Sequence, residues 1–264
     1  MSLSGKERCD LFCRGNVQEV KQFLKDNPTW DVNDDLDLNG WTALHIACFN
    51  GHCEIVSVLV AHPNINVNSK TNAVSTPFFL GCYWGHVEAV KVLLRDHRVD
   101  INMPEDGGRT PLWEASRYEY VEVIKWMIAS GRELDLDRKS KVCGKEYTAI
   151  EIARLEDNKD AALLLEKFTE NPAQCRHEVR LELGVPEALA AELFAAKVFL
   201  CDDYLRIRRR ESNSEVGRFF GIASRLPMEL QMLLCHRVYG SAKDNIPSRN
   251  SEPAFKHLAS LYQK

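Results

Sequence analysis

The residues that could bind a metal ion are few in this chain. Cysteine and histidine, the usual ligands of zinc, lie together at Cys175-Arg176-His177 and at Cys235-His236. Neither spacing matches a zinc module, and the chain has no H-E-x-x-H pair on a helix. Isolated cysteines and histidines in helices usually pack in a core. We therefore predict no metal-binding residues.

The residues that could catalyse a reaction are similarly dispersed. The acidic pairs Asp34-Asp35 and Asp202-Asp203 lie in expected turns or on helix surfaces, where solvated charge is the simpler interpretation. The sequence contains no G-x-x-x-x-G-K-S/T phosphate loop and no G-x-S-x-G nucleophile turn. We predict no catalytic and no cofactor-binding residues, and hence a protein that is not an enzyme and has no small-molecule substrate. A catalytic site within residues 172–264 has no motif to support it.

Composition excludes several classes of partner. The chain has 264 residues, of which 45% are hydrophobic and 27% charged, and its formal net charge is −4. This balance argues against a nucleic-acid partner, and no apolar run approaches the ~20 residues that span a bilayer. The first residues lack the apolar core of a signal peptide. Nine cysteines without paired spacing favour a reducing compartment. We expect the cytoplasm, with the nucleus as an alternative.

A repeat dominates the organisation of the chain. Thr42, Thr76 and Thr110 each begin a similar segment, and successive threonines are 34 residues apart. A fourth segment starts at Thr148, after 38 residues. The additional residues fit in the polar stretch 138–146, which we interpret as a lengthened hairpin tip.

Each segment carries the pattern of two short paired helices. Threonine followed by proline at Pro77 and Pro111 is typical of a helix start. Gly51 and Gly85 separate this first helix from a second one with apolar residues at spacings of three and four. Helices this short cannot bury their apolar faces alone, so the units must stack.

The pattern Thr76-Pro77-Phe78-Phe79-Leu80 and its copies resemble the ankyrin-repeat family, over about residues 5–168. The resemblance implies an all-α solenoid of helix–turn–helix units joined by hairpin turns, and a partner that is a protein or peptide. The expected domain is 1–171, with units 5–37, 38–71, 72–105, 106–143 and 144–170. The first and last units would act as caps.

One departure from the family concerns the histidine that normally bonds neighbouring units. His45 is the intact copy, whereas Phe79, Trp113 and Glu151 stand at the matching positions. We expect the later joints to hold by packing instead. The turn asparagine Asn102 lies in a context similar to that of hydroxylated ankyrin asparagines, but a turn-stabilising role is the stronger interpretation.

The resemblance also implies where a partner would bind. In the family, hairpin tips and first helices form a concave groove. The outward positions of that groove carry aromatic residues and arginines here, which dominate protein-interface hot spots. The predicted partner-binding residues are Trp41, Phe49, Asn50, Tyr83, Trp84, Arg109, Arg117, Tyr118 and Tyr147. For Trp84, and likewise for Trp113 outside this set, packing between units is an equal alternative. The strip suggests a scaffold for a partner with apolar anchors and some acidic character.

Residues 172–264 depart from the repeat. Their alanine- and leucine-rich segments predict a small C-terminal helical bundle. Residues 226–234, Leu-Pro-Met-Glu-Leu-Gln-Met-Leu-Leu, resemble the opening of an F-box, a motif that recruits a ubiquitin-ligase core. The alternative function is therefore a substrate adaptor of a ubiquitin ligase. The same residues also fit a helix with proline in its first turn, which is the simpler interpretation.

Overall fold

The computed structural model describes residues 5–185, which form eleven helices and one two-stranded sheet within that range. The chain divides after residue 176 into two compact regions, and the described part lies almost entirely in the first region, Met1–Arg176. The expected domain boundary is 171. The predicted helical bundle of residues 172–264 falls, from residue 186 onward, outside the described residues.

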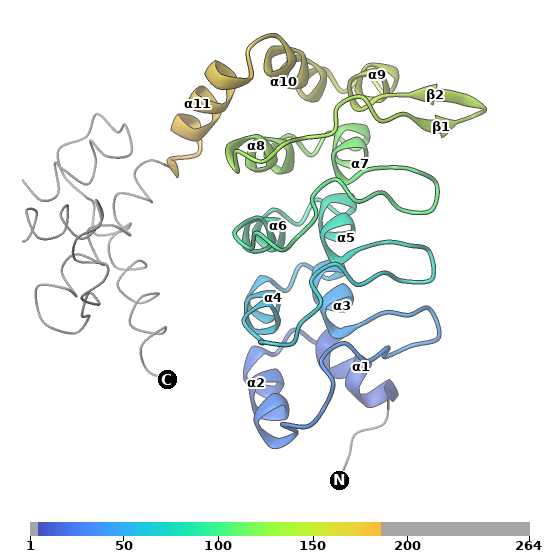
Figure 1. Cartoon of the computed structure of the whole chain (residues 1–264), viewed down its shortest axis with the longest axis vertical. Helices are drawn as coiled ribbons and strands as arrows, with labels where there is room; N and C mark the ends of the chain where they lie inside the picture. The colour runs from blue at the N-terminus through green and yellow to red at the C-terminus, as the bar shows by residue number, and fades with distance from the viewer. Residues whose placement is uncertain (1–4, 186–264) are drawn as a thin grey trace, which may run out of the picture. The chain divides into compact units, whose positions relative to one another are not determined.

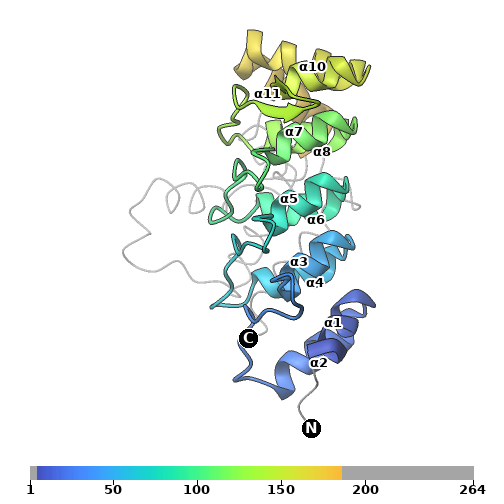
Figure 2. The ribbon, with the colours of Figure 1, turned by 90° about the vertical axis from the view of Figure 1, so that its right-hand side faces the viewer.

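Ten of these helices form five consecutive pairs in the first region, and each pair belongs to one repeat unit (Figure 1). One helix of each pair belongs to a layer next to the loops, which we call the inner layer. The other helix belongs to an outer layer, and Figure 2 shows the same stack from the side. The inner layer is α1 (Gly5–Cys13), α3 (Ala43–Phe49), α5 (Pro77–Tyr83), α7 (Pro111–Arg117) and α9 (Ala149–Leu155). The outer layer is α2 (Val17–Asp26), α4 (Cys53–Val60), α6 (Val87–Leu94), α8 (Val121–Ala129) and α10 (Lys159–Glu170).

The repeated threonines occupy matching positions, as predicted. The hydroxyl oxygens of Thr76, Thr110 and Thr148 accept hydrogen bonds from the backbone N–H three residues on, at 3.1, 3.1 and 3.3 Å. Pro77 and Pro111 each occupy the first turn of the helix that follows. These bonds satisfy amide groups that a helix start leaves unpaired, which explains why α5, α7 and α9 each begin directly after a threonine.

The hairpin tip predicted for residues 138–146 is present as a short antiparallel sheet. Strands β1 (Ser140–Val142) and β2 (Lys145–Tyr147) pair with Ser140 opposite Tyr147. The Ser140 hydroxyl donates to the Gly107 carbonyl at 2.9 Å, which ties this hairpin to the preceding loop. The longer fourth connection therefore extends outward without interrupting the stack.

Neighbouring units are joined by side chains that reach backbone groups. His45 Nε2 lies 3.0 Å from the Ser69 carbonyl and 3.1 Å from the Ser75 carbonyl. The expectation that the later joints hold by packing alone is wrong at Trp113. Its indole N–H donates to the Tyr147 carbonyl at 2.9 Å, and Tyr147 precedes its threonine as Ser75 does. An indole can replace the histidine because it also presents a ring N–H.

Helix α11 (Pro172–Glu182) follows the fifth pair, and its first residues contact the stack. Arg176 Nε donates to the Ile128 carbonyl at 3.2 Å, near the end of α8, and Cys175 is buried. Cations are favoured at the end of a helix, because its last carbonyl groups carry partial negative charge. Among residues 5–185, no helix is both long enough and apolar enough to cross a bilayer.

Candidate partner-binding surface

Five of the predicted residues form one continuous chain of aromatic rings, which we call the aromatic strip: Trp41, Phe49, Trp84, Tyr83 and Tyr118. Ring centroids are 5.0 Å apart for Trp41–Phe49 and Phe49–Trp84, 5.2 Å for Trp84–Tyr83 and 5.5 Å for Tyr83–Tyr118. All four pairs meet edge to face, a favourable arrangement for aromatic rings. The strip therefore crosses the second, third and fourth units without a gap between its rings.

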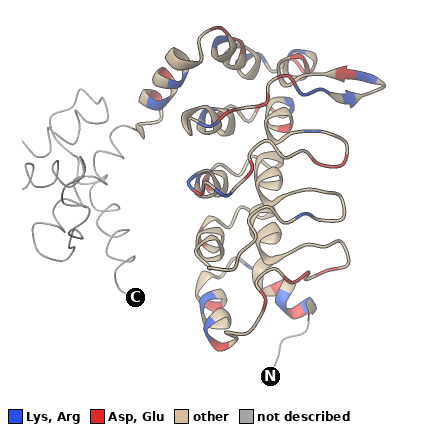
Figure 3. Ribbon diagram, in the orientation of Figure 1, with Lys and Arg blue, Asp and Glu red and all other residues tan. Residues whose placement is uncertain are grey.

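The aromatic strip lies on the inner layer and stays partly open to solvent. Trp84 is 45% exposed and Tyr118 41% exposed, while Trp41, Phe49 and Tyr83 are half-buried. Of the two alternatives for the tryptophans, Trp84 is thus a surface residue and Trp113 a core residue. Figure 3 shows that α3 and α5 carry no charged residues, whereas α7 carries Glu114 and Arg117. The strip is an apolar surface in its N-terminal part and a mixed one in its C-terminal part.

Arg109 is held between two carboxylates. Its Nε lies 3.0 Å from Glu105 Oε1, and its Nη1 lies 2.8 Å from Glu114 Oε1. The hydrogen bond to Glu105 raises the pKa of Arg109 further above its already high value. Burial alone would raise the pKa of Glu105, but the hydrogen bonds from Arg109 and the Gly107 backbone outweigh it and lower that pKa. Burial raises the pKa of Glu114, which is fully enclosed.

Arg117 is also paired. Its Nε lies 3.3 Å from Glu156 Oε1 in the fifth unit, and its guanidinium lies over the rings of Trp113 and Tyr118. Because both arginines have carboxylate partners, the basic patch that the sequence suggests is neutralised. This weakens the inference that the partner has acidic character.

Two predicted residues lie apart from the aromatic strip. Asn50 is exposed, and its side chain donates to the Ile46 carbonyl of its own helix at 2.9 Å, so it caps α3. Tyr147 makes no ring contact with the strip among the described residues. It lines a shallow hollow of about 420 Å³ together with Glu146, Glu151, Arg154 and Leu155. Leu155 is 52% exposed there.

Sequence reasoning missed Glu105 and Glu114 as the carboxylate partners of Arg109. Glu114 stands four residues after Thr110, where the other units have Ile46, Leu80 and Ile152. A charged residue at a position that is otherwise aliphatic was the signal that could have identified it.

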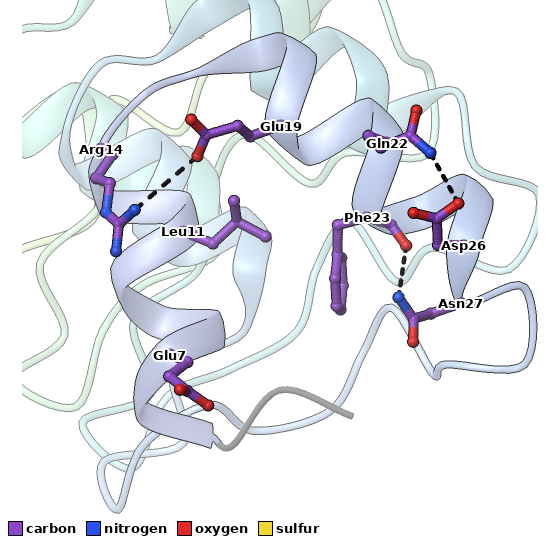
Figure 4. A pocket seen from close by; sticks show the side chains of 8 residues that line it. All are labelled: Glu7, Leu11, Arg14, Glu19, Gln22, Phe23, Asp26 and Asn27. Carbon is purple, nitrogen blue, oxygen red and sulfur yellow. Dashed lines mark hydrogen bonds and ion pairs between the residues drawn. The ribbon is translucent and has the colours of Figure 1, made fainter. Parts of the chain in front are cut away.

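Another hollow lies in the first repeat unit between α1 and α2 and measures about 600 Å³ (Figure 4). Its polar side chains largely bond within the same unit: Gln22 Nε2 donates to Asp26 Oδ1 at 2.8 Å, and Asn27 Nδ2 to the Phe23 carbonyl at 2.8 Å. Within residues 5–185, no three histidine, cysteine or acidic side chains are placed to hold a metal ion.

Comparison with protein families matches two models to this stack. Residues 11–71 match a model of ankyrin repeats in three copies, and residues 78–128 match a model of ankyrin repeats in many copies. Residues 11–128 of the chain are therefore ankyrin repeats. The repeats indicate a protein–protein interaction module, and proteins of this family are typically non-enzymatic scaffolds. No curated protein sequence matches the chain. The F-box-like residues 226–234 lie outside the described residues.

Proposed function

We propose that this protein is a non-enzymatic scaffold that binds a partner protein or peptide across the aromatic strip. The observation that carries the proposal is the unbroken chain of ring contacts from Trp41 to Tyr118, with Trp84 and Tyr118 left nearly half exposed. Folding does not require tryptophan and tyrosine at exposed positions, whereas binding favours them. These side chains offer a large contact area and lose little rotamer entropy when a partner covers them.

The proposed partner presents apolar side chains to the strip. Helices α3 and α5 bring no charge to it, and the arginines at its C-terminal part are already paired with Glu105, Glu114 and Glu156. The expected acidic character of the partner is therefore not part of the proposal. Free thiols at every described cysteine suit a reducing compartment, so we place the interaction in the cytoplasm or nucleus.

The test compares two variants of the full chain as affinity baits in a cell extract. Trp84→Ala with Tyr118→Ala removes the exposed rings of the strip. Leu163→Ala is the matched control, because Leu163 is 63% exposed but lies on α10 in the outer layer. We expect a defined set of proteins to bind the wild type and the control but not the strip variant, with all three melting at similar temperatures. Equal capture by the strip variant would contradict the proposal.

The alternative function, a substrate adaptor of a ubiquitin ligase, rests on residues 226–234. Since these residues are outside the described part of the chain, no observation on the structure favours it.

A further inference from the structure

Glu114 is an exception to the pattern of this stack. The matching residues Ile46, Leu80 and Ile152 are buried aliphatic side chains, and Glu114 is buried as completely, with 0% exposure. Enclosing a carboxylate is costly unless the group is paired and hydrogen-bonded. Neither oxygen of Glu114 accepts a hydrogen bond from the described residues, although Arg109 lies within ion-pair distance. An aliphatic side chain would suit folding better, so the charge calls for another explanation.

The geometry around Arg109 offers one. Glu105 contacts Nε and Glu114 contacts Nη1, so two carboxylates fix the orientation of a planar guanidinium. Neither contact uses Nη2, whose N–H groups have no partner among the described residues. The Arg109 side chain remains 32% exposed, and Tyr83 of the aromatic strip is one of the groups near enough to affect its pKa. Arg109 thus offers one oriented hydrogen-bond donor near the aromatic strip.

We propose that Glu114 is a positioning residue that, with Glu105, holds Arg109 so that its Nη2 donates to a main-chain carbonyl of a peptide segment lying along the aromatic strip. This inference rests on the proposed function and names the chemistry of the partner at that point. Arg109 is the specificity-determining residue, because a segment that places no acceptor against it forms only the apolar contacts.

An uncharged carbonyl fits this position better than a carboxylate does. Arg109 already has two carboxylates beside it, and Glu156 is paired with Arg117. A further negative charge would meet like charges at close range, which is unfavourable in a partly buried site. A carbonyl gains a charge-assisted hydrogen bond without that repulsion.

The alternative explanation, a purely structural ion pair, makes a different prediction for Glu114→Ile. Replacing a buried ion pair with a well-packed aliphatic side chain is often neutral or stabilising. In this variant Glu105 still neutralises Arg109, so no unpaired charge is left. If the ion pair is purely structural, Glu114→Ile leaves peptide binding unchanged. If Glu114 positions Arg109, the same variant weakens peptide binding without lowering stability.

The experiment uses the full chain and a displayed library of random peptides. Peptides are first selected whose binding is lost in Trp84→Ala, and affinities are then measured for synthetic copies. We expect Glu114→Ile, and Glu114→Leu as a second variant, to melt at or above the wild-type temperature yet bind about tenfold more weakly. Arg109→Met should weaken binding to a similar degree. The double variant Arg109→Met with Glu114→Ile should bind no worse than Arg109→Met alone, because Glu114 acts through Arg109.

Replacing single peptide bonds of the bound peptide by esters locates the acceptor, since an ester carbonyl is a weaker acceptor. We expect the ester replacement at one position of the peptide to weaken its binding to the wild type but not to Arg109→Met. Wild-type affinity in Glu114→Ile would overturn the positioning role. Selected peptides that share an Asp or Glu whose effect disappears in Arg109→Met would overturn the uncharged acceptor. If no selected peptide depends on Trp84, the proposed function fails, and this inference fails with it.

Discussion

At the residue scale, the turn between paired helices shows how one position depends on the next unit. Gly51 and Gly85 have positive φ angles of 72° and 69°. A Cβ at Gly51 would lie 2.7 Å from the His86 ring, and one at Gly85 would lie 2.7 Å from the Tyr120 ring. Glycine is therefore required both by the backbone and by the ring that packs on it.

The fourth unit has Glu119 at this position, with φ of 56°. The residue of the next unit is Asn158, a shorter side chain whose amide donates to the Ser116 and Arg117 carbonyls at 3.0 and 2.6 Å. Gly51 and Gly85 must be glycine partly because a Cβ would collide with the aromatic ring of the next unit. The shorter Asn158 does not impose this steric limit on Glu119. The left-handed backbone conformation, which is unfavourable for a residue with a Cβ, remains.

We predict that Glu119→Gly raises the free energy of unfolding by about 0.5–1 kcal/mol. Glycine removes the strain of the left-handed backbone conformation, which stabilises the folded chain. Part of this gain is offset because glycine also increases the conformational entropy of the unfolded chain. Glu119→Ala is the control, because it removes the side chain and keeps the strain. Urea denaturation measures both variants, and an equal gain from alanine would show that the side chain, not the backbone, is responsible.

His45 is held by bonds that fix its protonation state. The Thr42 backbone N–H donates to Nδ1 at 3.1 Å, so the ring proton belongs on Nε2, which faces the Ser69 and Ser75 carbonyls. Burial lowers the pKa of His45 to about 4, from an ordinary value of 6.5. The folded chain therefore requires a neutral histidine at this joint.

A pH dependence follows from this depressed pKa. Between pH 6.5 and 4 the unfolded chain binds a proton at His45 and the folded chain does not. The contribution of His45 to the free energy of unfolding is therefore fully present above pH 6.5 and decreases as the pH falls. The loss from this residue is on the order of 3 kcal/mol by pH 4. Denaturation of the wild type and His45→Gln at several pH values isolates this effect. If both lose stability in parallel, His45 is not its source.

At the element scale, asparagines in the turns after the outer helices connect successive units. Asn33 Nδ2 donates to the Asn64 carbonyl and Asn33 Oδ1 accepts from the Asn66 N–H, both at 2.8 Å. Asn68 makes the same pair of bonds to Arg98 and Asp100, at 2.7 and 2.8 Å. Asn102 makes them to Glu133 and Asp135, at 2.9 and 3.0 Å. These bonds support the turn-stabilising interpretation of Asn102.

We predict that Asn68→Ala lowers the free energy of unfolding by about 1–2 kcal/mol, because it removes two bonds between the second and third units. Asn64→Ala is the matched control. Asn64 is exposed in the same turn, and its side chain makes no hydrogen bond among the described residues. Chemical denaturation compares the two, and a similar loss in both would mean that the bonds of Asn68 do not hold the units together.

The sequence predicted the elements more completely than the contacts between them. The spacing of Thr42, Thr76 and Thr110 located the inner helices, because helix starts depend on local chemistry. The bond from Trp113 to the Tyr147 carbonyl was not predictable, because its acceptor is a backbone group 34 residues away. The strip residues were identified individually, but the pairing of Arg109 with Glu105 and Glu114 requires the folded loop.

At the scale of the whole molecule, a stack of repeats gains stability from contacts between neighbours. The units that contain α5 to α8 have a neighbour on each side, and Phe78, Leu93 and Ile124 in them are fully buried. The unit of α1 and α2 has one described neighbour and lacks the threonine–proline start. It also contains the hollow of about 600 Å³. The unit of α1 and α2 is therefore expected to bury less surface against its neighbours than the units that contain α5 to α8.

We predict that amide hydrogen exchange is faster in α1 and α2 than in α5 to α8, because a terminal unit can open while losing one interface and an inner unit must lose two. Exchange measured by mass spectrometry at low denaturant resolves these segments. The difference should narrow as denaturant rises and global unfolding becomes the shared route. Uniform protection from α1 to α8 at low denaturant would instead mean that the stack opens only as a whole, and that the first unit is as firmly joined as the others.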